Sequence, residues 1–145
     1  MSLQYDRSEP AVKVGPVEGA RRPGTLPYAA PEVLQGLRLS AATDLYSLAC
    51  TAVELLTGEP PFPRSTAFAI THAHLTAAPP SLRVRRSWLP AALDDVVGAA
   101  LAKDPADRPA SCTEFAARLT DALDGVRVPG PAEPRARLVR WRGRR

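Results

Sequence analysis

The chain has 145 residues, of which 45% are hydrophobic, and a formal net charge of +4. This length supports one domain with a hydrophobic core and hardly two. The range 127–145 holds seven arginines and one glutamate, whereas the range 24–126 holds more acidic than basic residues. The positive charge therefore belongs to the C-terminal end and not to the central part, and we predict no specific nucleic-acid partner.

The cysteines and the apolar segments exclude several further classes of protein. Cys50 and Cys112 are far apart and show no C-x-x-C spacing, so we expect free thiols and no disulfide framework or zinc site. The first residues lack the apolar core of a signal peptide. The most apolar stretch, 45–56, is shorter than the roughly 20 residues that span a bilayer. We expect a cytoplasmic location.

The first half of the chain predicts an irregular segment and then a long helix. Residues 1–23 show no sustained periodicity, and a proline favours one short helical turn over 31–34. Ser40 or Thr43 is placed to cap a helix that runs to about Leu56, where a Gly-Glu-Pro-Pro sequence ends it. The helix is apolar on nearly every side, which predicts a buried central helix.

Three more helices are predicted after the long one. The first covers 66–75, and the second begins near Pro90, with apolar residues spaced at three and four. The third begins at Ser111, which can form a capping box with Glu114, and ends at Gly125. The sequence shows no convincing strand alternation and no internal repeat. The predicted fold is mainly α.

Four short segments resemble protein-kinase signatures and occur in the family's order. The sequence GTLPYAAPE at 24–32 resembles the end of an activation segment, closing on A-P-E. DLYSL at 44–48 resembles the start of the buried central helix, and ELLTGEPPF at 54–62 resembles its end and exit turn. KDPADRP at 103–109 resembles the loop before the last helix of the lobe. Over residues 24–124 the chain is similar to bacterial-type (Hanks-type) Ser/Thr protein kinases.

This resemblance implies a fold and a division of the chain. The implied fold is the back part of the helical C-terminal lobe of the protein-kinase-like fold, truncated and without the small β-rich lobe. Residues 1–23 would be an irregular activation-loop remnant, 24–124 a partial kinase lobe, and 125–145 a Pro/Arg-rich basic tail. The tail resembles the basic linker of bacterial receptor kinases. Contact with anionic surfaces is one role open to it, and a solvated tail without a partner is the other.

The resemblance also implies structural and peptide-binding residues. Glu32 and Arg108 would form a partly buried bidentate salt bridge that pins the activation segment to the lobe, although two unrelated surface charges remain the alternative. Asp44 would accept hydrogen bonds from the catalytic loop, or it would only favour the helix N-terminus. The segment that contacts the residue after the phosphoacceptor would consist of Gly24, Thr25, Leu26, Pro27 and Tyr28.

The residues that perform phosphoryl transfer in kinases are not found in this sequence. It contains no G-x-G-x-x-G, no H-R-D and no D-F-G, and Lys13 and Lys103 lie in the wrong contexts to bind phosphate. We therefore expect no catalytic, cofactor-binding or metal-binding residues, although intact relatives use ATP and Mg²⁺.

The expected function is that of a Ser/Thr protein kinase family member that is inactive alone, and whether the chain is an enzyme stays open. A non-catalytic module that binds protein substrates or a kinase partner is one alternative. The other is a binder of nucleic acid or anionic membrane that works through the tail.

Other polar and aromatic side chains carry weaker signals. His72 and His74 are two residues apart and point to different sides of a helix, so they cannot share a metal as an i, i+4 pair could. We expect both to be solvated. Ser47 is expected to bond within the core, and Trp88 is expected to anchor packing before the third predicted helix.

Overall fold

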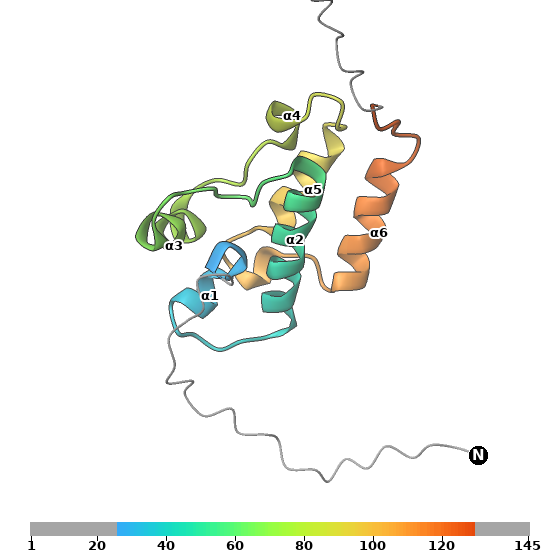
Figure 1. The fold of residues 1–145 in the computed structure, drawn as a ribbon. Helices are drawn as coiled ribbons and strands as arrows, with labels where there is room; N and C mark the ends of the chain where they lie inside the picture. Colours follow the sequence, from blue (N-terminus) through green and yellow to red (C-terminus); the bar gives the residue numbers. More distant parts are fainter. Residues whose placement is uncertain (1–25, 130–145) are drawn as a thin grey trace, which may run out of the picture.

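The computed structural model describes residues 26–129, which form helices joined by loops (Figure 1). No strand occurs within this range, so the predicted mainly α fold is confirmed for it. The elements are η1 (Leu26–Tyr28), α1 (Pro31–Leu34), α2 (Ala41–Thr57), α3 (Ala67–Thr76), α4 (Leu82–Arg85), α5 (Ala92–Ala100), η2 (Pro105–Asp107) and α6 (Cys112–Leu123). The segment 1–23, which was predicted to be irregular, Gly24, Thr25 and the part of the predicted tail beyond residue 129 lie outside the described residues.

Local sequence determines where α2 begins and ends. The Ser40 hydroxyl accepts a hydrogen bond from Ala42 N–H at 3.3 Å, and Thr43 Oγ1 accepts one from Ser40 N–H at 3.1 Å. Both predicted capping residues therefore take part in the N-terminal cap. At the other end, Gly58 adopts a left-handed conformation with φ of 87°, which a glycine reaches without steric cost.

The hydrophobic core lies where α2, α5 and α6 pack side by side (Figure 1). Trp88 is partly buried against this core, as predicted, and the Cys50 thiol is free and fully buried. Burial raises the pKa of Cys50 to about 12, so this thiol stays protonated and unreactive. The largest buried side chains of the three helices are Leu45, Tyr46 and Val53 in α2, Leu93 and Val97 in α5, and Phe115 in α6.

The prediction that α2 is buried on nearly every side is wrong for one face. Leu48 is 40% exposed and Leu55 is 82% exposed, and they lie two turns apart on the same side of the helix. The described helices pack against the other faces of α2. An apolar sequence indicates which side chains would gain free energy from burial, but it does not say which neighbours are present.

Two features of the later helices depend on contacts that the sequence did not indicate. The short helix α4 was not predicted, and its first turn is capped from α5: Asp94 accepts hydrogen bonds from Ser81 Oγ and Leu82 N–H, both at 2.7 Å. At α6 the Ser111 hydroxyl accepts from Glu114 N–H at 3.0 Å as predicted. The Glu114 carboxylate, however, accepts from Ala110 N–H at 2.9 Å instead of completing the capping box.

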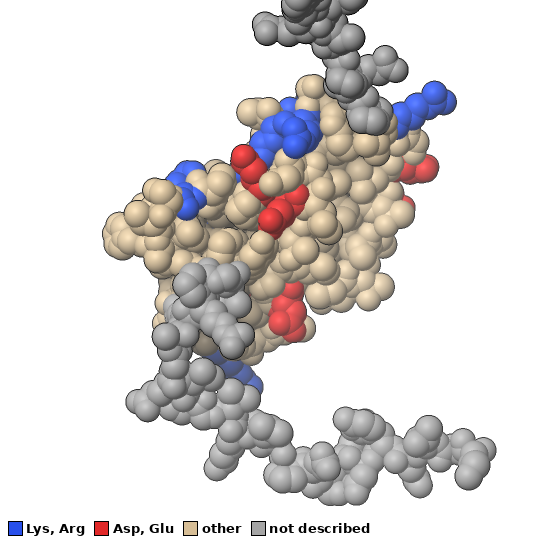
Figure 2. All heavy atoms as spheres, in the orientation of Figure 1, with Lys and Arg blue, Asp and Glu red and all other residues tan. Residues whose placement is uncertain are grey.

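The surface of the described residues carries few charges on the face shown in Figure 2. Basic and acidic side chains are scattered there among uncharged atoms, and some of opposite sign lie close together. Within residues 26–129 no helix is both long and apolar enough to cross a membrane.

Candidate functional site

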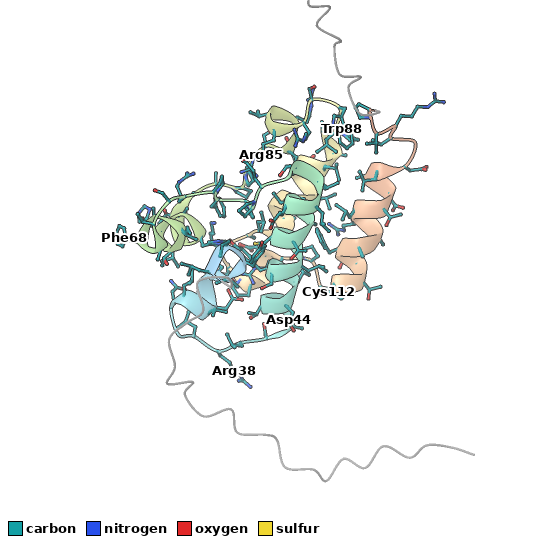
Figure 3. All side chains as sticks on the ribbon, in the orientation of Figure 1. Arg38, Asp44, Phe68, Arg85, Trp88 and Cys112 are labelled. Carbon is teal, nitrogen blue, oxygen red and sulfur yellow. The ribbon has the colours of Figure 1, made fainter. Side chains whose placement is uncertain are left out.

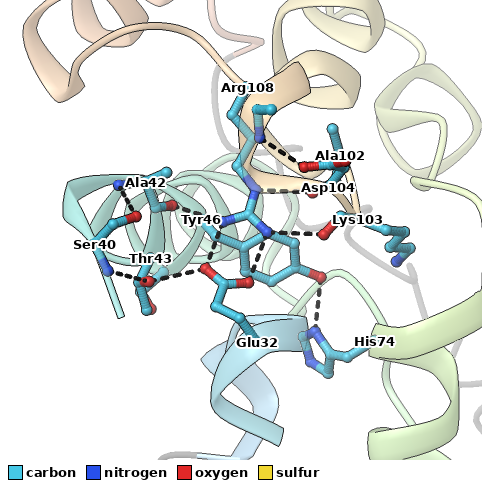
Figure 4. A network of polar contacts seen from close by, with 12 residues as sticks. Glu32, Ser40, Ala42, Thr43, Tyr46, His74, Ala102, Lys103, Asp104 and Arg108 are labelled. Carbon is cyan, nitrogen blue, oxygen red and sulfur yellow. Dashed lines mark hydrogen bonds and ion pairs between the residues drawn. The ribbon is translucent and has the colours of Figure 1, made fainter. Parts of the chain in front are cut away.

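The site is built around a buried ion pair between Glu32 in α1 and Arg108, which follows η2 (Figure 4). Arg108 Nη1 and Nη2 donate to the two carboxylate oxygens of Glu32 at 2.8 and 2.9 Å, although the residues are 76 positions apart. Arg108 is 6% exposed and Glu32 is 3% exposed. The predicted bidentate pairing is present, and it ties the segment before α2 to the loop before α6.

Every N–H of the Arg108 guanidinium has an acceptor. Besides Glu32, Nε donates to the carbonyl of Ala102 at 2.8 Å, Nη1 to that of Ala42 at 2.8 Å and Nη2 to that of Lys103 at 3.2 Å. An arginine offers five such donors in a planar fork, so the site satisfies all of them. A lysine could not replace this arrangement because its ammonium group has only three donors.

The surroundings keep the Glu32 carboxylate ionised. Burial raises the pKa of this carboxyl, but hydrogen bonds from Arg108, the backbone and Thr43 outweigh that effect and lower the pKa below its ordinary value. The hydroxyl of Thr43 donates to Glu32 at 2.8 Å, which also links the ion pair to the first turn of α2. The carboxylate thus couples α1, α2 and the loop before α6.

Side chains of α2 and α3 hold η1, the described part of the predicted peptide-contacting segment. The Ser47 hydroxyl donates to the carbonyl of Tyr28 at 2.9 Å, and the Tyr28 hydroxyl donates to the carboxylate of Glu54. His74 Nε2 lies 3.1 Å from the carbonyl of Pro27. Ser47 and Glu54 fall inside the quoted kinase-like segments, but their contacts with η1 were not predicted. The prediction for Ser47 was only a bond within the core.

The prediction that His74 is solvated is wrong. Its side chain is fully buried, whereas His72 is exposed as predicted. The ring lies 2.9 Å from the Tyr46 hydroxyl and makes an edge contact with Phe62 at a centroid distance of 5.0 Å. Helix α3 has apolar residues around much of its circumference, so its sequence does not reveal which side faces the protein.

Asp44 is exposed in the first turn of α2, as Figure 3 shows. Within residues 26–129 its side chain makes no hydrogen bond or ion pair, and an acid at this position interacts favourably with the helix macrodipole. Its implied contact with a catalytic loop stays a prediction, because the sequence contains no H-R-D motif.

A shallow pocket opens beside η1. It has a volume of about 240 Å³ and is lined by Tyr28 together with Thr51, Glu54 and Leu55 of α2. Leu55 is largely exposed there. Since Tyr28 both lines this pocket and bonds to Glu54, the pocket and the η1 segment form one continuous surface.

Comparisons with known proteins agree on one family. The family model for the protein kinase domain matches residues 12–119. Serine/threonine-protein kinase PknF of Mycobacterium tuberculosis is 44% identical over 106 residues, which cover 73% of this chain and 22% of that protein. PknJ of Mycobacterium bovis is 45% identical over 112 residues, which cover 76% and 19%, respectively. The chain thus spans about a fifth of the length of these curated relatives.

A solved structure supports the fold. The twitchin kinase region from C. elegans superposes with a TM-score of 0.57 at 24% sequence identity, over 76% of this chain and 18% of that one. Identity at this level speaks for the fold alone. The predicted helical lobe of the protein-kinase-like fold is confirmed.

Proposed function

Because the chain belongs to the protein kinase domain family, we propose that it is the part of a Ser/Thr protein kinase that holds the protein substrate. The observation that carries the proposal is the attachment of η1, in which Pro27 and Tyr28 bond to side chains of α2 and α3. A segment held in place before binding loses little conformational entropy when a peptide docks on it. The ion pair of Glu32 and Arg108 holds the residues that follow η1.

The proposed role does not include nucleotide binding by this chain. Phosphoryl transfer needs groups that position ATP, metal ions and the acceptor hydroxyl, and the sequence lacks the motifs that supply them. Catalysis would then depend on residues outside these 145. A non-catalytic interaction module would use the same η1 surface, so substrate holding and nucleotide binding have to be tested separately.

Calorimetric titration of ATP and Mg²⁺ into the purified chain tests the nucleotide half of the proposal. We expect no heat of binding, because neither a phosphate-covering loop nor metal-holding motifs are present. A cooperative thermal melt on the same sample controls for folding. A micromolar affinity for ATP would overturn this half.

Titration of Ser- and Thr-containing peptides, followed by NMR, tests the substrate half. We expect peptides to shift the signals of η1 and the neighbouring pocket. Tyr28→Ala is expected to weaken binding at least about tenfold, because it removes both the pocket wall and the bond to Glu54. Val84→Ala in α4, where the side chain is 87% exposed, is the matched control and should bind like the parent. Equal binding by the two variants would reject η1 as the peptide surface.

A further inference from the structure

We propose that His74 is a positioning residue, which sets the place of Pro27 and Tyr28 by joining the Pro27 carbonyl to the Tyr46 hydroxyl. Helix α3 would then help to fix the position of the peptide-binding segment η1 through the bond of His74 to Pro27. The inference rests on the proposed function for its significance, because the segment that His74 holds is the proposed peptide-binding segment. The contacts themselves are drawn in part in Figure 4.

The two contacts of His74 require one tautomer of the ring. A carbonyl oxygen can only accept a hydrogen bond, so Nε2 must carry the proton that reaches Pro27 at 3.1 Å. The neutral ring then has a lone pair on Nδ1, which accepts from the Tyr46 hydroxyl at 2.9 Å. Both ring nitrogens are thereby used, and the imidazole bridges α2 and η1 from its place in α3.

The surroundings of His74 favour this neutral ring. Burial, followed by the nearby ammonium group of Lys103, lowers the pKa of His74 to about 4. The Lys103 ammonium lies 4.6 Å from the centre of the Phe62 ring, which packs against the imidazole in a T-shaped arrangement. On the α2 side, the Arg108 guanidinium lies 4.9 Å from the centre of the Tyr46 ring. The charge of Arg108 is balanced by its ion pair with Glu32, so Lys103 is the cation that, together with burial, disfavours a positive charge on the imidazole.

The backbone of η1 depends on such side-chain contacts. Pro27 has no N–H, and among the described residues the turn is closed by a backbone bond from Ala29 N–H to the Leu26 carbonyl at 3.2 Å. A short 3₁₀ turn of this kind has little stability of its own. The donors from α2 and α3 therefore decide where the turn sits, and His74 is the one that comes from α3.

Two substitutions of His74 test its hydrogen bonds to Pro27 and to Tyr46 one at a time. In His74→Gln the longer side chain can place an amide N–H near the position of Nε2, so the bond to Pro27 can be kept. In His74→Asn the shorter side chain can still accept from Tyr46, but it does not reach Pro27. A purely structural role as a buried hydrogen-bonding group would predict similar effects of both variants on η1.

Amide hydrogen exchange of the full chain measures the position of η1 locally. We expect His74→Asn to accelerate exchange of the Ala29 amide about tenfold, and His74→Gln less than about threefold, because one hydrogen bond is lost in the first case and kept in the second. The amide of Phe115, bonded to the Ser111 carbonyl at 3.1 Å in α6, serves as the internal control and should not change. Equal acceleration of Ala29 in both variants, or no acceleration in either, would overturn the proposal.

Nitrogen NMR of the imidazole in the unmodified chain gives a test that needs no variant. We expect the Nε2–H tautomer at pH 7, and an Nδ1–H tautomer or a charged ring would overturn the proposal even if His74→Asn did not fold. Peptide titration of the same variants distinguishes the two proposals. If Ala29 responds as expected but no peptide binds to any form, positioning by His74 stands and the substrate-holding function fails.

Discussion

Replacement of Arg108 by alanine is expected to lower the free energy of unfolding by about 3–5 kcal/mol, because it leaves the buried Glu32 carboxylate without its counter-charge. The variant also leaves carbonyl groups of Ala42, Ala102 and Lys103 without this donor. Urea unfolding followed by circular dichroism measures the change. Arg108→Lys should be intermediate, because it keeps the charge but loses the planar fork.

Arg118→Ala is the matched control for this prediction. Arg118 pairs with Glu114 one turn away in α6, but its side chain is 54% exposed. Exposed pairs at this spacing contribute about 0.3–0.5 kcal/mol, so the control variant should unfold almost like the parent. If Arg108→Ala and Arg118→Ala lose the same small amount of stability, the ion pair of Glu32 and Arg108 does not hold the lobe together.

Acidification from pH 6.5 to about pH 4 is expected to destabilise the folded chain by up to about 1.4 kcal/mol per pH unit through His74 alone. The pKa of His74 is about 4 in the folded chain against an ordinary value of 6.5, so the unfolded chain takes up the proton first. The contribution is fully present above pH 6.5 and is lost as the pH falls. Glu32 acts in the same direction at lower pH, because its pKa lies below the ordinary value of 4.5.

Unfolding in urea at a series of pH values tests this dependence. In His74→Gln the free energy of unfolding should depend less on pH between pH 6.5 and 4.5 than in the parent. The further loss of stability below pH 4.5 should remain, because it comes from carboxylates such as Glu32. Lys103, whose pKa is lowered to about 8, titrates outside this window and does not disturb the comparison. An unchanged slope between pH 6.5 and 4.5 in His74→Gln would show that His74 is not held neutral by the fold.

The sequence alone determined those structural features, such as helix starts, that depend on residues close to one another along the chain. The starts of α2 and α6 were predicted at or near Ser40 and Ser111, because a capping side chain bonds to backbone groups two or three residues away. The resemblance to kinases, carried by short ordered segments, implied the pairing of Glu32 with Arg108 across 76 positions. Periodicity alone could not have paired them.

Only the tertiary structure decided which faces of the helices are covered and which polar groups meet. Leu55 was expected to be buried and is exposed, whereas His74 was expected to be solvated and lies beneath η1. The cap of α4 by Asp94 likewise comes from a different helix. Burial and these contacts depend on which elements approach one another in space. The periodicity of one helix does not indicate which other elements pack against it.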